Sequence, residues 1–159
     1  EREYTRPMSL GADVRTALKR AGKYVFAPLP WVKPDAAPRM VGDGPPSATE
    51  YLTVARERHW PRRRESRGRG YYSEPTASTR GQGARDPMPG QKPLRLMRHI
   101  VLDFSDPGDV VAEPFCGSGT TGRACAIEGR HAILCDIDSD RVTMARGDGA
   151  ERNGQHPLF

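Results

Sequence analysis

The residues best suited to chemistry in this sequence surround a glycine-rich turn, Cys-Gly-Ser-Gly, at residues 116–119. The apolar residues before the turn predict a short buried strand, and Thr120 and Thr121 begin a predicted helix after it. Glycines let the backbone turn tightly and approach a ligand closely. The helix N-terminus adds unpaired N–H groups and the positive end of the helix dipole. This combination suits the carboxylate of a small cofactor or a phosphate group.

A carboxylate, Asp136, directly follows the next apolar run at residues 132–135. In nucleoside-binding α/β folds, an acid at this place accepts hydrogen bonds from ribose hydroxyls. Gly117, Gly119 and Gly122 also match the dinucleotide spacing G-x-G-x-x-G loosely. A P-loop requires a lysine that this turn lacks, which argues against a nucleoside triphosphatase. The residues alone therefore predict a nucleoside-containing ligand and leave the choice of cofactor open.

A second group of candidate residues lies in the arginine-rich segment 56–69. Arginine side chains form paired hydrogen bonds with phosphates and stack on bases. The aromatic residues Trp60, Tyr71 and Tyr72 flank the segment, as in loops that meet nucleic acid. A solvated loop is the alternative interpretation. The residues predicted to contact DNA are Arg58, Arg62, Arg63, Arg64, Arg67 and Arg69.

Composition narrows the classes of protein. The 159 residues are the usual size of one domain, and the net charge of +5 favours a polyanionic partner. No run of about 18 apolar residues predicts a membrane-spanning helix, and no secretory signal opens the chain. Three cysteines without a C-x-x-C pair favour a reducing cytoplasm and argue against a zinc site or a disulfide framework.

Hydrophobic periodicity and breaker residues predict the elements that position these groups. Pro28 and Pro30 are expected to break the strand that starts at Tyr24. Helices are expected at residues 10–21, 94–104, 120–128 and 139–147, and strands at 24–26, 50–54, 110–113 and 132–135. Loops are expected at residues 35–47 and 73–90, and a tail at 148–159.

Four motifs occur in a fixed order along the chain. They are Gln-Lys-Pro-Leu at residues 91–94, Asp-Pro-Gly-Asp-Val-Val-Ala-Glu-Pro-Phe-Cys-Gly-Ser-Gly-Thr-Thr-Gly at 106–122, Gly-Arg at 129–130 and Cys-Asp-Ile-Asp at 135–138. Together they resemble the S-adenosylmethionine-dependent DNA methyltransferases that methylate an exocyclic amino group, N6 of adenine or N4 of cytosine. Their order is most similar to the permuted, phage- or prophage-type branch, in which the cofactor motifs follow the catalytic motif.

This resemblance implies an α/β fold with a Rossmann-like class I methyltransferase sheet. It makes residues 1–159 the C-terminal part of a single methyltransferase domain. Residues 56–90 are then a basic flexible loop that faces double-stranded DNA, and residues 91–147 form the part that binds S-adenosylmethionine. The residues that the resemblance assigns to the cofactor are Lys92, Pro93, Glu113, Pro114, Phe115, Cys116, Gly117, Ser118, Gly119, Thr120, Thr121, Asp136 and Ile137.

The implied roles differ along the cofactor. Lys92 and Pro93 lie against its methionine end, and the loop at residues 113–119 wraps around it. Thr120 and Thr121 face its carboxylate. Asp136 holds the ribose hydroxyls, and Ile137 packs against the adenine ring. Glu113 replaces the more frequent aspartate, a change of one methylene group.

One motif of the family is absent from the sequence. The catalytic motif is Asp or Ser, then Pro-Pro, then an aromatic residue, and it holds the flipped target base. The sequence Asp-Gly-Pro-Pro at residues 43–46 lacks that order and no aromatic residue follows. The catalytic residues are therefore unknown. The resemblance implies that a central strand and its neighbour are missing, so that the sheet is incomplete here.

Three hypotheses follow. The favoured one is a DNA amino-methyltransferase whose sheet is completed by a missing N-terminal segment or by a second subunit. The second is a catalytically inactive DNA- or cofactor-binding module or remnant. The third is an enzyme that uses a nicotinamide dinucleotide, which the residues near the turn do not favour. The first residue, Glu1, is not methionine, which is expected for a processed chain or for part of a longer product.

Overall fold

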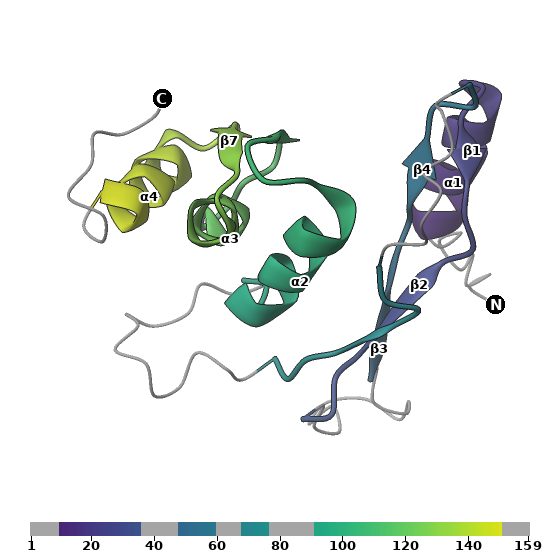
Figure 1. The fold of residues 1–159 in the computed structure, drawn as a ribbon, viewed down its shortest axis with the longest axis horizontal. Coiled ribbons are helices and arrows are strands. Elements are labelled where there is room, and N and C mark those ends of the chain that lie inside the picture. Colours follow the sequence, from purple (N-terminus) through teal and green to yellow (C-terminus); the bar gives the residue numbers. More distant parts are fainter. Residues whose placement is uncertain (1–9, 36–47, 60–67, 77–90, 151–159) are drawn as a thin grey trace, which may run out of the picture.

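A computed structural model describes residues 10–35, 48–59, 68–76 and 91–150. These residues form four helices and seven strands with short connections between most of them (Figure 1). The elements in chain order are α1 (Leu10–Arg20), β1 (Tyr24–Val25), β2 (Leu29–Val32), β3 (Thr49–Leu52), β4 (Ala55–Arg56), β5 (Tyr72–Ser73), α2 (Leu94–Phe104), β6 (Val110–Glu113), α3 (Thr120–Glu128), β7 (His131–Leu134) and α4 (Ser139–Ala150).

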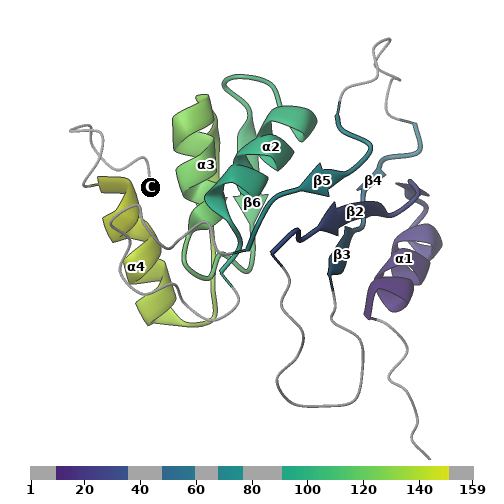
Figure 2. The same cartoon turned by 90° about the horizontal axis from the view of Figure 1, so that it is seen from below.

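The C-terminal elements form a parallel βαβ unit. Strand β6 pairs with β7 from Val110↔His131 to Glu113↔Leu134, and α3 is the crossover between them. Helix α3 packs against α2, β7 and α4 (Figure 2). The other face of this small sheet leaves Val110 and Ile133 61% and 56% exposed. Parallel sheets are normally covered on both faces, but the described residues cover only one face of this unit.

The N-terminal strands form two further sheets. Strand β2 lies between β3, to which it is antiparallel, and β5, to which it is parallel. Strands β1 and β4 form an antiparallel pair, and α1 contacts β1. The part of the chain that the structure describes therefore holds three separate sheets rather than one, which agrees with the expectation of an incomplete sheet.

Helix α2 packs on both halves and joins them into one body (Figure 2). Its residue Leu96 is in the cluster of Trp31 and Tyr72 from the N-terminal strands. Its residue Val101 is in the cluster of Ala124 and Cys125 from α3. An eleven-residue helix with apolar positions on two sides can bury both, because residues three to four apart share a face.

The expected helices and most of the strands are confirmed. Helices α2 and α3 have the predicted bounds, α1 ends at Arg20 rather than at residue 21, and α4 continues to Ala150, into the region predicted as tail. Strand β7 begins one residue earlier than expected. The expected loop 35–47 and the tail after residue 150 lie almost entirely outside the described residues.

The strand that starts at Tyr24 ends at Val25, before Pro28, as expected, but the expectation that Pro30 also breaks a strand is wrong. Pro30 lies within β2 and is paired with Tyr51 of β3. Strand β5 pairs only with Trp31 and Val32, so Pro30 has a neighbouring strand on one side and its missing N–H is tolerated there. Residues 56–90 were predicted as a flexible loop, but β5 lies within this range and β4 ends at its first residue. Parts of the range are therefore structured.

No helix among the described residues is both long enough and apolar enough to span a membrane.

Candidate functional site

The glycine turn between β6 and α3 is fixed by a carboxylate from the end of β7. The Oδ2 atom of Asp136 accepts a hydrogen bond of 2.8 Å from the backbone N–H of Gly117, and its Oδ1 accepts one of 3.1 Å from Asp138. The backbone N–H of Cys116 also donates to the carbonyl of Cys135 at 2.8 Å. The turn is therefore held to the second strand by side-chain and backbone bonds together.

The same hydrogen bonds favour the ionised form of the Asp136 carboxyl group. The N–H groups of Asp138 and Gly117 lower the pKa of its carboxyl group, which stays ionised at neutral pH. Each carboxylate oxygen has two lone pairs, so both retain room for a further donor. The predicted ribose ligand and the observed turn contact can therefore share this one side chain.

A second carboxylate, Glu113, ends β6 at the start of the turn. Its Oε2 atom is buried and has no hydrogen-bond partner among the described residues. Burial raises the pKa of the neighbouring Cys116 thiol, and the negative charges of Asp136 and Glu113 raise it further. The turn is thus a site of negative potential with one unsatisfied acceptor, and buried acceptors normally have a donor.

Helix α3 begins with open N–H groups beside these carboxylates. Its N-cap is Gly119, and no side chain caps the helix. The hydroxyls of Ser118 and Thr120 lie 3.1 Å apart, and the Gln91 side-chain amide donates to Thr120 Oγ1 at 3.5 Å. Thr120 and Thr121 are both buried, whereas Ser118 is half-buried. This end of α3 offers backbone donors and the Ser118 hydroxyl to an anionic group.

Two apolar side chains near the turn are fully or largely exposed. Phe115 is 82% exposed and Ile137 is completely exposed. Pro114 lies between Glu113 and Phe115 and is also exposed. Large apolar side chains exposed beside polar groups are typical of ligand sites. The structure thus brings residues 113–121 together with Asp136 and Ile137.

Lys92, predicted at the methionine end of the cofactor, has an ion-pair partner within the protein. Its ammonium group lies 2.8 Å from Glu50 Oε2 on β3 and 5.4 Å from the centroid of the Trp31 ring. Lys33 lies 2.6 Å from the other oxygen of Glu50. Pro93, the next residue, is buried at the start of α2. Lys92 therefore links α2 to the N-terminal strands.

The pKa of Glu50 leads to a prediction about pH. Burial pushes this pKa up, but the hydrogen bonds and charges of Lys33 and Lys92 outweigh burial and leave it below the ordinary value of 4.5. A carboxyl with a lowered folded pKa stabilises the fold above its unfolded pKa, and this effect is lost as pH falls through the folded value. Glu50→Gln is therefore expected to lower the melting temperature by a few degrees at pH 7 and by progressively less below about pH 4.5.

Thermal denaturation of both proteins over a pH series measures this difference. Glu57→Gln is a matched control, because Glu57 pairs with a single lysine and is more exposed than Glu50, 57% against 40%. Its effect should be smaller. A constant difference for Glu50→Gln at every pH would contradict the prediction.

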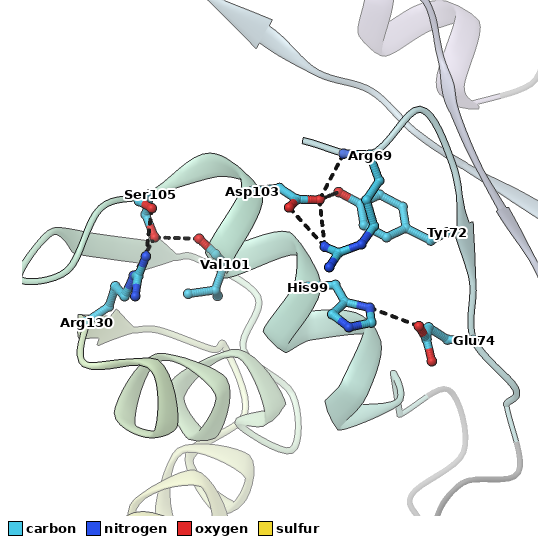
Figure 3. A network of polar contacts seen from close by, with 8 residues as sticks. All are labelled: Arg69, Tyr72, Glu74, His99, Val101, Asp103, Ser105 and Arg130. Carbon is cyan, nitrogen blue, oxygen red and sulfur yellow. Dashed lines mark hydrogen bonds and ion pairs between the residues drawn. The ribbon is translucent and has the colours of Figure 1, made fainter. Parts of the chain in front are cut away.

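The structure changes the interpretation of Arg69, in the basic segment, and of Tyr72, which follows it. Arg69, predicted to contact DNA, has its guanidinium group 2.9 and 3.0 Å from the two oxygens of Asp103 on α2 (Figure 3). Tyr72, named as a stacking candidate, is 1% exposed and donates its hydroxyl to the same carboxylate at 3.0 Å. Arg58 is exposed. The other predicted DNA contacts, Arg62, Arg63, Arg64 and Arg67, and the aromatic Trp60 lie outside the described residues.

Sequence reasoning missed several polar residues that hold these elements. Arg130 is buried and donates to the hydroxyl of Ser105 at 3.1 Å and to its carbonyl at 2.8 Å, so it joins the ends of α2 and α3 (Figure 3). Buried Glu74 pairs with His99 and Arg95 of α2 at 2.9 and 3.2 Å. Arg130 belongs to the Gly-Arg motif at residues 129–130, and that motif was the signal available for it.

A hollow of about 420 Å³ lies away from the glycine turn, along β5. Its lining residues are Arg69, Gly70, Tyr71, Tyr72, Ser73 and Glu74. Strand β5 pairs only with β2 among the described strands, so the hollow follows a free sheet edge. We assign the cofactor site to the turn and not to this hollow, because the turn carries the convergent polar groups that a small-molecule site needs.

The parallel βαβ unit, its glycine turn and the acid after the second strand define a class I, Rossmann-like methyltransferase fold. The crystal structure of TTHA0409 from Thermus thermophilus, in complex with S-adenosyl-L-methionine, superposes with a TM-score of 0.66. It is 26% identical in sequence, and the match covers 90% of this chain and 60% of that one. A sequence model described as DNA methylase matches residues 14–147. The chain belongs to this DNA methylase family.

Two relatives show how the sequence similarity is distributed. Type II methyltransferase M.Cfr9I from Citrobacter freundii is 30% identical over an alignment of 138 positions that covers 81% of this chain and 45% of the relative. DNA adenine methyltransferase YhdJ from Escherichia coli K12 is 45% identical over 56 residues, 35% of this chain and 19% of the relative. The chain spans less than half the length of each of these two relatives.

Proposed function

We propose that this chain is the S-adenosylmethionine-binding and DNA-facing part of an enzyme that methylates N6 of adenine or N4 of cytosine in DNA. The observation that carries the proposal is the pair of carboxylates at the glycine turn, with the buried Oε2 atom of Glu113 lacking a partner among the described residues. Membership of the DNA methylase family supports the reaction class, and the bound ligand of TTHA0409 supports the cofactor.

The residues at the turn fit this cofactor chemically. S-adenosylmethionine supplies a methyl group on a positive sulfonium, and it also carries an ammonium, a carboxylate and a ribose. Glu113 is a fitting acceptor for the ammonium, because an unpaired buried carboxylate oxygen requires a donor. The N–H groups at the start of α3 suit the carboxylate, and Asp136 suits the ribose hydroxyls. Phe115 and Ile137 offer apolar surface for adenine.

The same charges argue against a nicotinamide dinucleotide. Its pyrophosphate would lie at the turn, where Glu113 and Asp136 are close enough to shift the pKa of Cys116. Like charges at short range repel each other, and the repulsion grows as the local dielectric falls. A sulfonium and an ammonium are attracted by the same carboxylates.

The acceptor amine needs a strand that this sequence does not carry. Methyl transfer breaks the sulfur–methyl bond, forms a carbon–nitrogen bond and releases one proton from the amine, so the amine must be held in line with the sulfonium. We propose that a strand bearing Asp or Ser, Pro-Pro and an aromatic residue adds to β6, from a second subunit or from a further segment of the protein. Strand β6 pairs only with β7 among the described strands, and this free edge supports the position.

The partner is double-stranded DNA, contacted through the arginines of the basic segment. Arg58, Arg62, Arg63, Arg64 and Arg67 are the proposed phosphate contacts, and the net charge of +5 supports a polyanionic partner. A DNA substrate supports the cytoplasmic location expected from the cysteine pattern.

Calorimetric titration of the chain with S-adenosylmethionine tests the cofactor assignment, and titration with NADH is the control. Binding of S-adenosylmethionine is expected to be at least about tenfold tighter, because one unfavourable carboxylate–phosphate contact of about 1.4 kcal/mol accounts for a factor of ten. Preferential binding of NADH would overturn the assignment. Methyl transfer to DNA by this chain alone would contradict the proposed added strand.

A further inference from the structure

The basic segment ends at an arginine whose charge is already neutralised. The Asp103 carboxylate accepts hydrogen bonds from Arg69 Nη1 at 2.9 and 3.0 Å, from the Arg69 backbone N–H at 3.2 Å and from the Tyr72 hydroxyl at 3.0 Å (Figure 3). Asp103 is only 11% exposed, and Tyr72 is buried. Hydrogen bonds between charged groups are about twice as strong as neutral ones, so this contact is a firm attachment.

Asp103 occupies an unfavourable place for an unpaired acid. It lies in the last turn of α2, where the negative end of the helix dipole repels a carboxylate. The donors in these hydrogen bonds all come from residues 69–72, and they offset this repulsion. Asp103 is therefore unfavourable within its own helix but receives hydrogen bonds from residues 69–72. Its place in α2 is explained if its role is to hold that segment.

The other end of the basic segment is attached in a comparable way. The Arg56 guanidinium group lies 4.8 Å from the centroid of the Tyr24 ring and 5.9 Å from that of Phe26. It also donates to the carbonyl of Glu57 at 2.9 Å. Arg56 is in β4, which pairs with β1. The outermost arginines of the segment are therefore used within the protein at both ends.

We propose that Arg56 and Arg69 are anchors of the DNA-facing segment rather than DNA contacts, and that Asp103 positions this segment relative to the methyl donor. The inference rests on the proposed function and assigns separate roles within the basic segment. Helix α2 carries Asp103 near one end, and just before its other end Gln91 donates to Thr120 Oγ1 beside the glycine turn. Eleven residues at 1.5 Å each make it about 16 Å long. One rigid helix therefore sets the distance between the anchored segment and the glycine turn.

The anchor and contact roles predict opposite results for Asp103. If Arg69 contacts phosphate, removing the Asp103 charge with Asp103→Asn frees a cation and strengthens DNA binding. If Asp103 is the anchor, the same change weakens binding, because the segment loses its attachment and more of its ordering must occur on binding. The expected loss is about fivefold, which corresponds to roughly 1 kcal/mol.

Fluorescence anisotropy with a labelled DNA duplex over a series of KCl concentrations measures both affinity and salt slope. Arg63→Gln, in the centre of the segment, is the matched control and should reduce the slope of log K against log salt by about 0.9. Arg69→Gln and Asp103→Asn should both weaken binding about equally at every salt concentration and leave that slope unchanged. A slope reduced by Arg69→Gln as much as by Arg63→Gln, or tighter binding by Asp103→Asn, would overturn the inference.

Urea unfolding of the two single variants and the double variant tests the anchor independently of DNA. Asp103→Asn and Arg69→Gln should each lower the urea concentration at the unfolding midpoint. The double variant should be as stable as the less stable of the two single variants, because each change removes the same contact. Additive losses would overturn the anchor. Failure of the parent chain to bind DNA would instead contradict the proposed function, while this cycle would still report on the anchor.

Discussion

Replacement of Asp136 by alanine is expected to weaken S-adenosylmethionine binding by about 100-fold, the largest effect on binding of any single change considered. The side chain has two roles that fail together. It is proposed to hold the ribose hydroxyls, and it also holds the Gly117 N–H at 2.8 Å and the Asp138 N–H at 3.1 Å. Hydrogen bonds to a charged group are stronger than neutral ones, so the loss of ligand and turn contacts together reaches this magnitude.

Calorimetric titration of the variant with S-adenosylmethionine measures the loss. Asp138→Asn is the matched control, because Asp138 is a neighbouring carboxylate whose contacts are to Asp140 and Arg141 at the start of α4. This control should bind within about twofold of the parent. Equal affinities of Asp136→Ala and the parent would remove the basis for the cofactor site.

Replacement of Gly119 by alanine is expected to destabilise the fold by about 3 kcal/mol, the largest effect on stability. Gly119 has φ = 75°, a conformation that costs other residues roughly 1–2 kcal/mol. A Cβ atom there would also lie 2.6 Å from the Cβ and 2.8 Å from the Cα of Ala145 in α4. Because the Cα of Ala145 is backbone, α4 itself must shift, and overpacking of this kind costs about 1–3 kcal/mol.

Gly117→Ala separates strain from collision. Gly117 also has a positive φ, 51°, but no atom lies within 4 Å of a Cβ built there. It should cost only the strain of about 1–2 kcal/mol. Urea unfolding followed by circular dichroism measures both free energies. Equal losses for the two variants would mean that the close packing of the turn on α4 does not limit stability.

These two predictions test different properties of the same turn. Asp136→Ala should change cofactor affinity most, because it removes the proposed ribose contacts, and it should also lower stability through the lost hydrogen bonds to Gly117 and Asp138. Gly119→Ala should mainly lower the free energy of unfolding, and it should weaken cofactor binding only because the turn is distorted. The turn is therefore both the binding element and the packing contact between α3 and α4.

The sequence by itself determined the elements whose signals are local. Helices α2 and α3 were predicted with their bounds, α2 because apolar residues recur at helical spacing and α3 because Thr120 and Thr121 follow the glycine turn. The glycine turn and Asp136 were also predicted, because the turn is one continuous motif and Asp136 directly follows the next apolar run. The missing catalytic motif was also visible, because a tetrapeptide is a local pattern.

Only the tertiary structure decided which charged groups are free. Arg69 meets Asp103, 34 residues away, and Lys92 meets Glu50, 42 residues away. No local pattern predicts such pairs, because the energy of an ion pair depends on distance and burial rather than on sequence spacing. Strand β2 was likewise decided by its neighbours, since β5 leaves Pro30 unpaired on one side. The unpartnered oxygen of Glu113, which carries the cofactor proposal, exists only because folding buries it beside the turn.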